Sequence, residues 1–185
     1  MLGGAVVVAL LGALGGGAPI PTPIGVGPQF RVAAAPQRVL DGAPVGRFRC
    51  TASPAGRVSA HIELFANRRV LLLPAGVGMA PPLRREGAYV VGARCSYALR
   101  TTAPTGVVEI ARGAGATVGD LFRLWEQPLT RARLAGFRGS VRAYVGGVPW
   151  RGDPRVIPLE RHAQIVLELG GYVRPHRFFL FGARG

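Results

Sequence analysis

The sequence predicts an α+β fold that is rich in strands and has a mixed sheet with one main helix. Several short runs alternate apolar and polar residues and are separated by turn signals, as half-buried strands do. Only the segment Ala116–Pro128 has the period of an amphipathic helix. The 28 glycines and 16 prolines are scattered without a period, which also favours many turns and short elements.

Two hairpins are predicted ahead of the helix. In Val58–Pro74, alternation on both sides of Asn67 predicts two strands around a turn. The segment Pro74–Gly87 is expected to be a loop. The run Cys95–Ala111 alternates with a period of two, and Ala103–Gly106 has proline second and glycine fourth, as in a type I turn.

The helix and the last strands complete the predicted order. Thr117 is the expected N-cap of the helix, and Asp120 follows near its positive end. The run Ser140–Trp150 predicts two strands around a Gly-Gly turn, and Ala163–Gly170 alternates as a final strand. Hairpins on either side of one helix predict a β-grasp-like ββαββ plan with an extra N-terminal hairpin.

The charge predicts an anionic partner. The net charge is +14 at pH 7, with 23 basic residues, all of them arginine, against nine acidic residues. An arginine-only set is also typical of a high-GC bacterial genome, so part of this charge has a mutational origin. The arginines run along the whole chain, and no zinc-finger spacing or RNP-like motif indicates nucleic acid. We therefore expect anionic envelope polymers or lipids as partners.

The N-terminal segment predicts an extracytoplasmic location. The apolar run Ala5–Leu14 has the length of a signal-peptide core, but it departs from the usual pattern because no basic n-region precedes it. We expect residues 1–18 to be a signal peptide or an N-terminal membrane anchor. Residues 19–44 are rich in Gly, Pro and Ala and predict a linker. Residues 45–185 are then a single α+β domain, secreted or anchored.

The two cysteines, Cys50 and Cys95, are predicted to form a disulfide, because an isolated pair outside the cytoplasm is most often oxidised. Two free core thiols or a pair of metal ligands are the alternatives.

Motifs that support catalysis or cofactor binding are absent from the sequence. The glycine segment Gly113–Gly119 has the spacing GxGxxxG, and no acidic residue follows it at the distance that a dinucleotide site needs. No GxSxG or HExxH is present, and the three histidines stand apart from one another. We predict no catalytic residue and no small-molecule cofactor.

Four segments of the chain resemble an uncharacterised group of exported actinobacterial proteins: SAHIELFANRRVLLLPAGVGM, CSYALRTTAPTGVVEIA, ATVGDLFRLWEQPL and AYVGGVPWRGDPRVIPLERHAQIVLELG. The resemblance covers about Arg47 to Pro175, and Cys50, Cys95 and His162 match the framework of the group. In that group the first strand contains His-x-His, and the central hairpin contains HTHD followed by another histidine. The resemblance implies a metal site there, because imidazoles at alternate strand positions point to one face.

This chain departs from the histidine pattern. Ser59 replaces the first histidine of the pair, and His61 remains. The segment Arg100–Ala103 occupies the HTHD positions, and Glu109 replaces the later histidine. Arginine cannot coordinate a cation, and one imidazole with one carboxylate cannot close a tetrahedral site. We predict no metal, with His61 as a marginal candidate ligand.

A polar face is predicted in place of the metal site. Its members are Ser59, His61, Arg100, Thr102 and Glu109. Within it, Arg100 and Glu109 are expected to form a cross-strand ion pair, and the alternative is that Arg100 binds an anion.

These observations predict an exported or membrane-tethered, non-enzymatic domain that binds anionic envelope components through its arginines. A degenerate copper or zinc protein with a site around His61 is the first alternative. An enzyme whose site forms only in three dimensions is the second.

Overall fold

The computed structural model describes residues 30–31, 41–52 and 56–182. The predicted signal peptide or anchor at 1–18 lies outside the described residues, as does most of the predicted linker at 19–44. Among the helices of the described part, none has the length and apolar character needed to span a bilayer.

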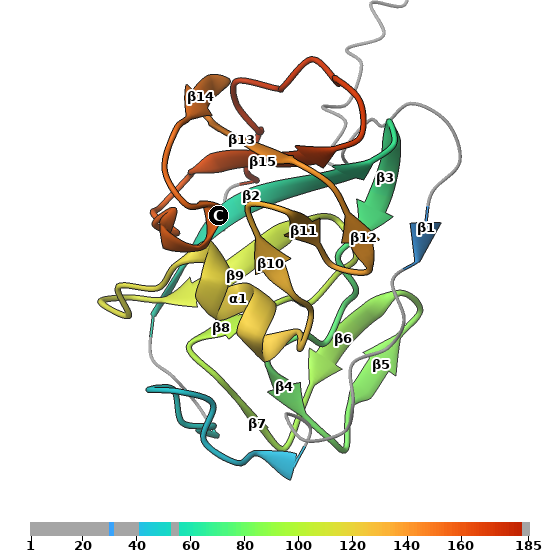
Figure 1. Cartoon of the computed structure of the whole chain (residues 1–185). Coiled ribbons are helices and arrows are strands. Elements are labelled where there is room, and N and C mark those ends of the chain that lie inside the picture. Colours follow the sequence, from blue (N-terminus) through green and yellow to red (C-terminus); the bar gives the residue numbers. More distant parts are fainter. Residues whose placement is uncertain (1–29, 32–40, 53–55, 183–185) are drawn as a thin grey trace, which may run out of the picture.

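The main sheet is mixed, and one helix packs on it, which confirms the predicted strand-rich α+β class (Figure 1). Its strands are β1 (Phe30–Arg31), β2 (Arg57–Ala66), β3 (Arg69–Leu72), β8 (Leu99–Arg100), β9 (Val107–Ala111), β13 (Val141–Val145), β14 (Val148–Trp150) and β15 (Gln164–Leu169). The order is β1-β3-β2-β15-β13-β14, with β9 paired to β2 and β8 to β9. Strand β2 is parallel to β15 and antiparallel to β3 and β9.

Smaller sheets surround this main sheet. They are formed by β4 (Met79–Ala80) with β7 (Cys95–Ser96), β5 (Arg84–Glu86) with β6 (Tyr89–Gly92), and β10 (Leu129–Thr130) with β11 (Arg133–Leu134) and β12 (Phe137–Arg138). The prediction of a loop at Pro74–Gly87 is therefore wrong in part, since β4 and β5 lie within it. These strands have only two or three residues and pair outside the main sheet, so they leave no alternating pattern to read.

Two of the three predicted hairpins form as expected, and the third forms in part. Strands β2 and β3 pair around Asn67 and Arg68, and β13 and β14 pair around the two glycines at 146–147. In the second hairpin only β8 and β9 pair with each other, because Cys95 and Ser96 pair with β4 instead. The first hairpin, which the sequence places as an addition to ββαββ, contributes the central strand β2.

Helix α1 (Val118–Leu124) begins as predicted. The Thr117 side chain accepts from the Asp120 backbone N–H, and the Asp120 carboxylate accepts from the Thr117 backbone N–H. This capping box satisfies two of the backbone donors that every helix leaves free at its start. The apolar side of α1 then packs on one face of the main sheet, where Leu121 and Leu124 belong to the same buried apolar cluster as Ile62 and Leu167.

The predicted disulfide between Cys50 and Cys95 is confirmed. The bond joins residues 45 positions apart, and closure of a loop of that size in the unfolded chain corresponds to about 4 kcal/mol in a chain-entropy model. It ties the segment before β2 to β7.

Candidate functional site

The face of β2 and β15 that points away from α1 carries buried polar side chains. Counted along each strand, every second residue points to this face. Its polar members are His61 and Glu63 on β2 and Gln164 and Glu168 on β15, and the apolar Phe65 and Val166 lie among them. All four polar side chains are almost completely shielded from water. Alternation of this kind predicts a half-exposed strand, so some other part of the chain must cover this face.

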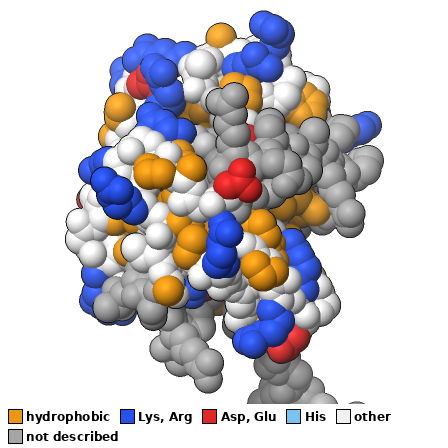
Figure 2. Space-filling view, turned by 90° about the horizontal axis from the view of Figure 1, so that it is seen from below, with side chains coloured by type: hydrophobic (Ala, Val, Ile, Leu, Met, Phe, Trp, Pro, Cys, Tyr) orange, Lys and Arg blue, Asp and Glu red, His pale blue; other side chains and the backbone are white. Residues whose placement is uncertain are grey.

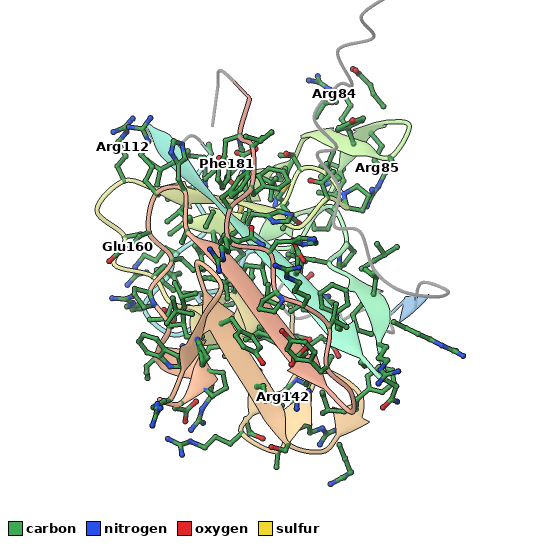
Figure 3. The ribbon with its side chains drawn as sticks, turned by 90° about the horizontal axis from the view of Figure 1, so that it is seen from above. Arg84, Arg85, Arg112, Arg142, Glu160 and Phe181 are labelled. Carbon is green, nitrogen blue, oxygen red and sulfur yellow. A yellow bond between two sulfur atoms is a disulfide. The ribbon has the colours of Figure 1, made fainter. Side chains whose placement is uncertain are left out.

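The covering segment is Gly171–Gly182, which we call the strap. It has no regular secondary structure and lies over β2 and β15, and Figure 3 labels Phe181 near its end. Phe179 stacks on the ring of His61 with 3.8 Å between ring centroids, and Phe181 stacks on His162 at 4.7 Å. The two phenylalanines also meet edge to face, which is a favoured geometry for aromatic pairs.

A row of hydrogen bonds runs beneath the strap. His176 Nδ1 lies 2.8 Å from Glu63 Oε2, and Gln164 Nε2 lies 2.9 Å from Glu63 Oε1. His61 Nδ1 lies 2.7 Å from Gln164 Oε1, and its Nε2 donates to the carbonyl of Thr105 at 3.0 Å. His176 is the exposed end of the row, with 44% of its side chain accessible, whereas His61 is fully enclosed.

The surroundings of His61 favour a neutral ring. Burial lowers its pKa from 6.5, and the nearby His176 acts in the same direction. The hydrogen bonds to Gln164 and Thr105 and the charge of Glu63 act in the opposite direction, and we take burial to prevail because no water reaches the ring.

The same strand buries a second carboxylate. Glu168 is completely enclosed and accepts from Arg142 Nε at 2.8 Å and from the Tyr144 hydroxyl at 3.1 Å. Its other oxygen accepts from the backbone N–H of Val173 at 2.8 Å, at the start of the strap. Burial and the bond to Glu168 raise the pKa of Tyr144 above 10, so its hydroxyl keeps the proton it donates. This buried carboxylate therefore ties three elements together: β13, β15 and the strap.

The predicted polar face divides into two groups. Arg100 lies opposite Glu109 on β8 and β9, and their side chains form the expected ion pair at 2.7 Å. Thr102 donates to the same carboxylate at 2.9 Å. His61 instead belongs to the row beneath the strap, and Ser59 lies opposite Glu109 in the β2–β9 register. Whether any part of this face binds a ligand stays a prediction.

A further cation stands beside this ion pair. The guanidinium of Arg57 donates to Ser96 Oγ and to the carbonyls of Tyr97 and Ala98. Burial, followed by repulsion from Arg100, lowers the pKa of Arg57 to about 10. The carbonyl partners allow this second cation to remain close to Arg100.

The geometry offers little to a metal ion. Both nitrogens of His61 are engaged in hydrogen bonds, so coordination would break one of them. The sulfur atoms of Cys50 and Cys95 are bonded to each other in the disulfide. Within residues 41–52 and 56–182, no three side chains of His, Cys, Asp or Glu are arranged to hold an ion.

Sequence reasoning missed several members of the row. The alternation of β2 places Glu63 on the same face as His61, and the alternation of β15 places Gln164 and Glu168 together. Nothing in the sequence indicates that His176 returns to Glu63, since the two are 113 positions apart and the strap has no period.

Arginines gather on the small sheet β10–β12. Arg133 on β11 lies directly opposite Arg138 on β12, and Arg131 precedes them in the turn from β10. The stretch Leu129–Arg138 has no acidic residue. Asp153 is already paired with Arg155, whose hydrogen bonds lower the pKa of Asp153 to about 2. The positive charge of Arg131 contributes to this shift in the same direction. We call Arg131, Arg133 and Arg138 the basic cluster.

Comparison with known proteins gives no match: no family model, no curated protein and no solved structure matches this chain at a significant level. The function is therefore inferred from the geometry of the chain itself.

Proposed function

We propose that this protein is an exported or membrane-tethered, non-enzymatic domain that binds anionic components of the cell envelope through arginine side chains. The observation that carries the proposal is the basic cluster, where Arg133 faces Arg138 across neighbouring strands. Like charges directly opposite each other destabilise a sheet. A phosphate-rich or carboxylate-rich partner would offset that repulsion.

A comparison inside the molecule supports this. Strands β8 and β9 have the same antiparallel geometry, but there Arg100 faces Glu109 and the charges cancel. The acidic residues near other arginines are likewise engaged, as Glu168 is by Arg142 and Asp153 by Arg155. Figure 2 shows arginine side chains spread over one face of the molecule, with few acidic ones among them. The surplus positive charge is thus at the surface and open to a partner.

Two further points concern location and fold. The Cys50–Cys95 bond supports an extracytoplasmic location, because such bonds persist in oxidising compartments. The order β3-β2-β15-β13, with β2 parallel to β15 and α1 between the two halves of the chain, supports a β-grasp-like arrangement. In this proposal the buried row of His61, Glu63 and Gln164 has a structural role, because it holds the strap against the sheet.

The test measures binding of the oxidised domain to poly(glycerol phosphate) over a range of salt concentrations. We expect the Kd to weaken as salt rises, because each arginine–phosphate contact releases counterions. The variant Arg131→Gln/Arg133→Gln/Arg138→Gln should lower the salt slope of log Kd by about 2 to 3.

The matched control removes the same charge elsewhere. Arg84, Arg85 and Arg112 are exposed and lie on other elements, and Figure 3 shows them across the molecule from Arg142, which follows β12 closely. Changing all three to glutamine should leave most of the slope intact. An equal loss in both triple variants would assign binding to net charge alone, and no salt-dependent binding of the unmodified domain would refute the proposal.

A further inference from the structure

The outward side of the strap is apolar and basic. Phe178 is 71% exposed, Leu180 is 56% exposed and Tyr172 is 57% exposed, which is unusual for large apolar side chains in one short segment. Arg174 and Arg177 lie among them and are also exposed. We call these five residues the outer face of the strap.

The inward side of the strap fixes the position of this outer face. Val173 is held by Glu168, His176 by Glu63, Phe179 by His61, and Phe181 by His162. The four anchors are spread from one end of the strap to the other and alternate with the outward residues. The strap backbone that carries the exposed side chains is therefore tied to the main sheet at several points, so presenting these side chains loses little conformational entropy.

Neighbouring residues extend the surface. A Cβ on Gly147 would lie 2.7 Å from Cγ of Arg177, so the stem of Arg177 covers the turn between β13 and β14. Val148, which begins β14 directly after that turn, is 67% exposed. The stretch Gly170–Gly182 contains no acidic residue. The surface thus combines apolar side chains with positive charge.

We propose that the outer face of the strap binds the surface of an anionic lipid bilayer, with Phe178 and Leu180 entering the interface. This inference rests on the proposed function and names its partner as lipid. Aromatic and aliphatic side chains flanked by arginines are typical of interfacial attachment, in which the apolar groups enter and the guanidinium groups remain at the phosphates. A second copy of the chain is disfavoured as the partner, because two such faces would bring Arg174 and Arg177 against like charges.

The experiment uses Phe178→Trp as a reporter, with vesicles of phosphatidylglycerol and phosphatidylcholine. We expect a blue shift of the added tryptophan emission with these vesicles and little shift with phosphatidylcholine alone. The variant Phe178→Ser/Leu180→Ser should weaken vesicle binding at least about tenfold, because two apolar side chains no longer leave water.

Two controls sharpen the result. Val156 is exposed to a similar degree on another element, so Val156→Trp should show no shift, and Tyr89→Ser/Val156→Ser should bind vesicles as the unmodified protein does. Circular dichroism would confirm that each variant is folded.

The outcomes separate this inference from the proposed function. Unchanged vesicle binding by Phe178→Ser/Leu180→Ser, while the basic-cluster variant loses polymer binding, would overturn the lipid surface alone. If the unmodified protein binds neither vesicles nor polymer, both this inference and the proposed function are overturned. A dimer in sedimentation velocity that the two serine substitutions dissociate would assign the face to a second copy and overturn the inference.

Discussion

The two faces of β2 and β15 are buried by different chemistry. On one face, Ile62 and Leu167 belong to the same apolar core as Leu121 of α1. On the other face, the same strands present His61, Glu63, Gln164 and Glu168 to the strap. One face is closed by a regular helix with an apolar stripe, and the other by an irregular segment that supplies hydrogen-bond partners and aromatic rings.

The difference shows what each face requires of its cover. Apolar packing depends on shape and volume, so the α1 face should accept a replacement of similar size. A buried polar group depends on its partners, because an unsatisfied donor or acceptor is penalised by its lost hydration. The strap must therefore reach each partner at a defined position. Two adjacent residues of β15, Leu167 and Glu168, allow the two requirements to be compared directly.

The largest effect is expected on the strap face. Glu168→Ala should lower the free energy of unfolding by about 3–5 kcal/mol, because it leaves the Arg142 guanidinium, the Tyr144 hydroxyl and the Val173 N–H without their acceptor. Urea unfolding would measure it. Glu168→Gln keeps the shape of the side chain and one acceptor oxygen, so its loss of unfolding free energy should be smaller than that of Glu168→Ala. A loss below that of Leu167→Ala would contradict the view that partners decide this face.

The α1 face provides the matched case. Leu167→Ala should lower the free energy of unfolding by about 2–5 kcal/mol, through lost apolar burial and the cavity that remains. Leu167→Met keeps the volume and should cost less than about 1.5 kcal/mol. The same urea titrations apply, and an equal loss for methionine and alanine would show that this face is as specific as the other.

A smaller effect is expected at Glu63. The Glu63 carboxylate accepts from Gln164 Nε2 at 2.9 Å and lies 2.8 Å from His176 Nδ1. Glu63→Gln keeps the size of the side chain and one acceptor oxygen, so it should lower the free energy of unfolding by less than about 1.5 kcal/mol. Glu63→Ala should be clearly more destabilising in the same thermal or urea assay. Equal losses for both variants would show that the row depends on the charge of Glu63.

The smallest effect is expected outside both faces, at the exposed pair of Asp153 and Arg155. Hydrogen bonds from Arg155 lower the pKa of Asp153 to about 2. Since the folded state binds this proton less readily than the unfolded state, the stabilising contribution is present above pH 3.8 and is lost as the pH falls toward 2. Arg155→Gln should return the pKa toward 3.8, as an NMR titration would show, with little change in Tm at neutral pH. A large fall in Tm would mean that exposed pairs matter as much here as buried Glu168.

Much of the fold follows from local signals. The Thr117 cap, the turn at Asn67 and the Gly146–Gly147 turn each depend on a few neighbouring residues, and each is found where the sequence predicts it. The Arg100–Glu109 pair follows equally, because the register of a short hairpin fixes which residues face each other. The short strands β4 and β5 were not predicted, because two or three residues are too few to show an alternating pattern.

The amino-acid sequence alone determined the longer strands of the main sheet, the helix start, the disulfide partners and the surplus of positive charge, since these depend on neighbouring residues, on a single possible pairing or on composition. Only the tertiary structure decided that β2 and β15 are buried on both faces. That decision depends on the strap returning over the sheet and placing His176 beside Glu63, a contact across 113 positions. Contacts of that range arise from packing and hydrogen-bond complementarity between distant segments, and no local pattern in the chain encodes them.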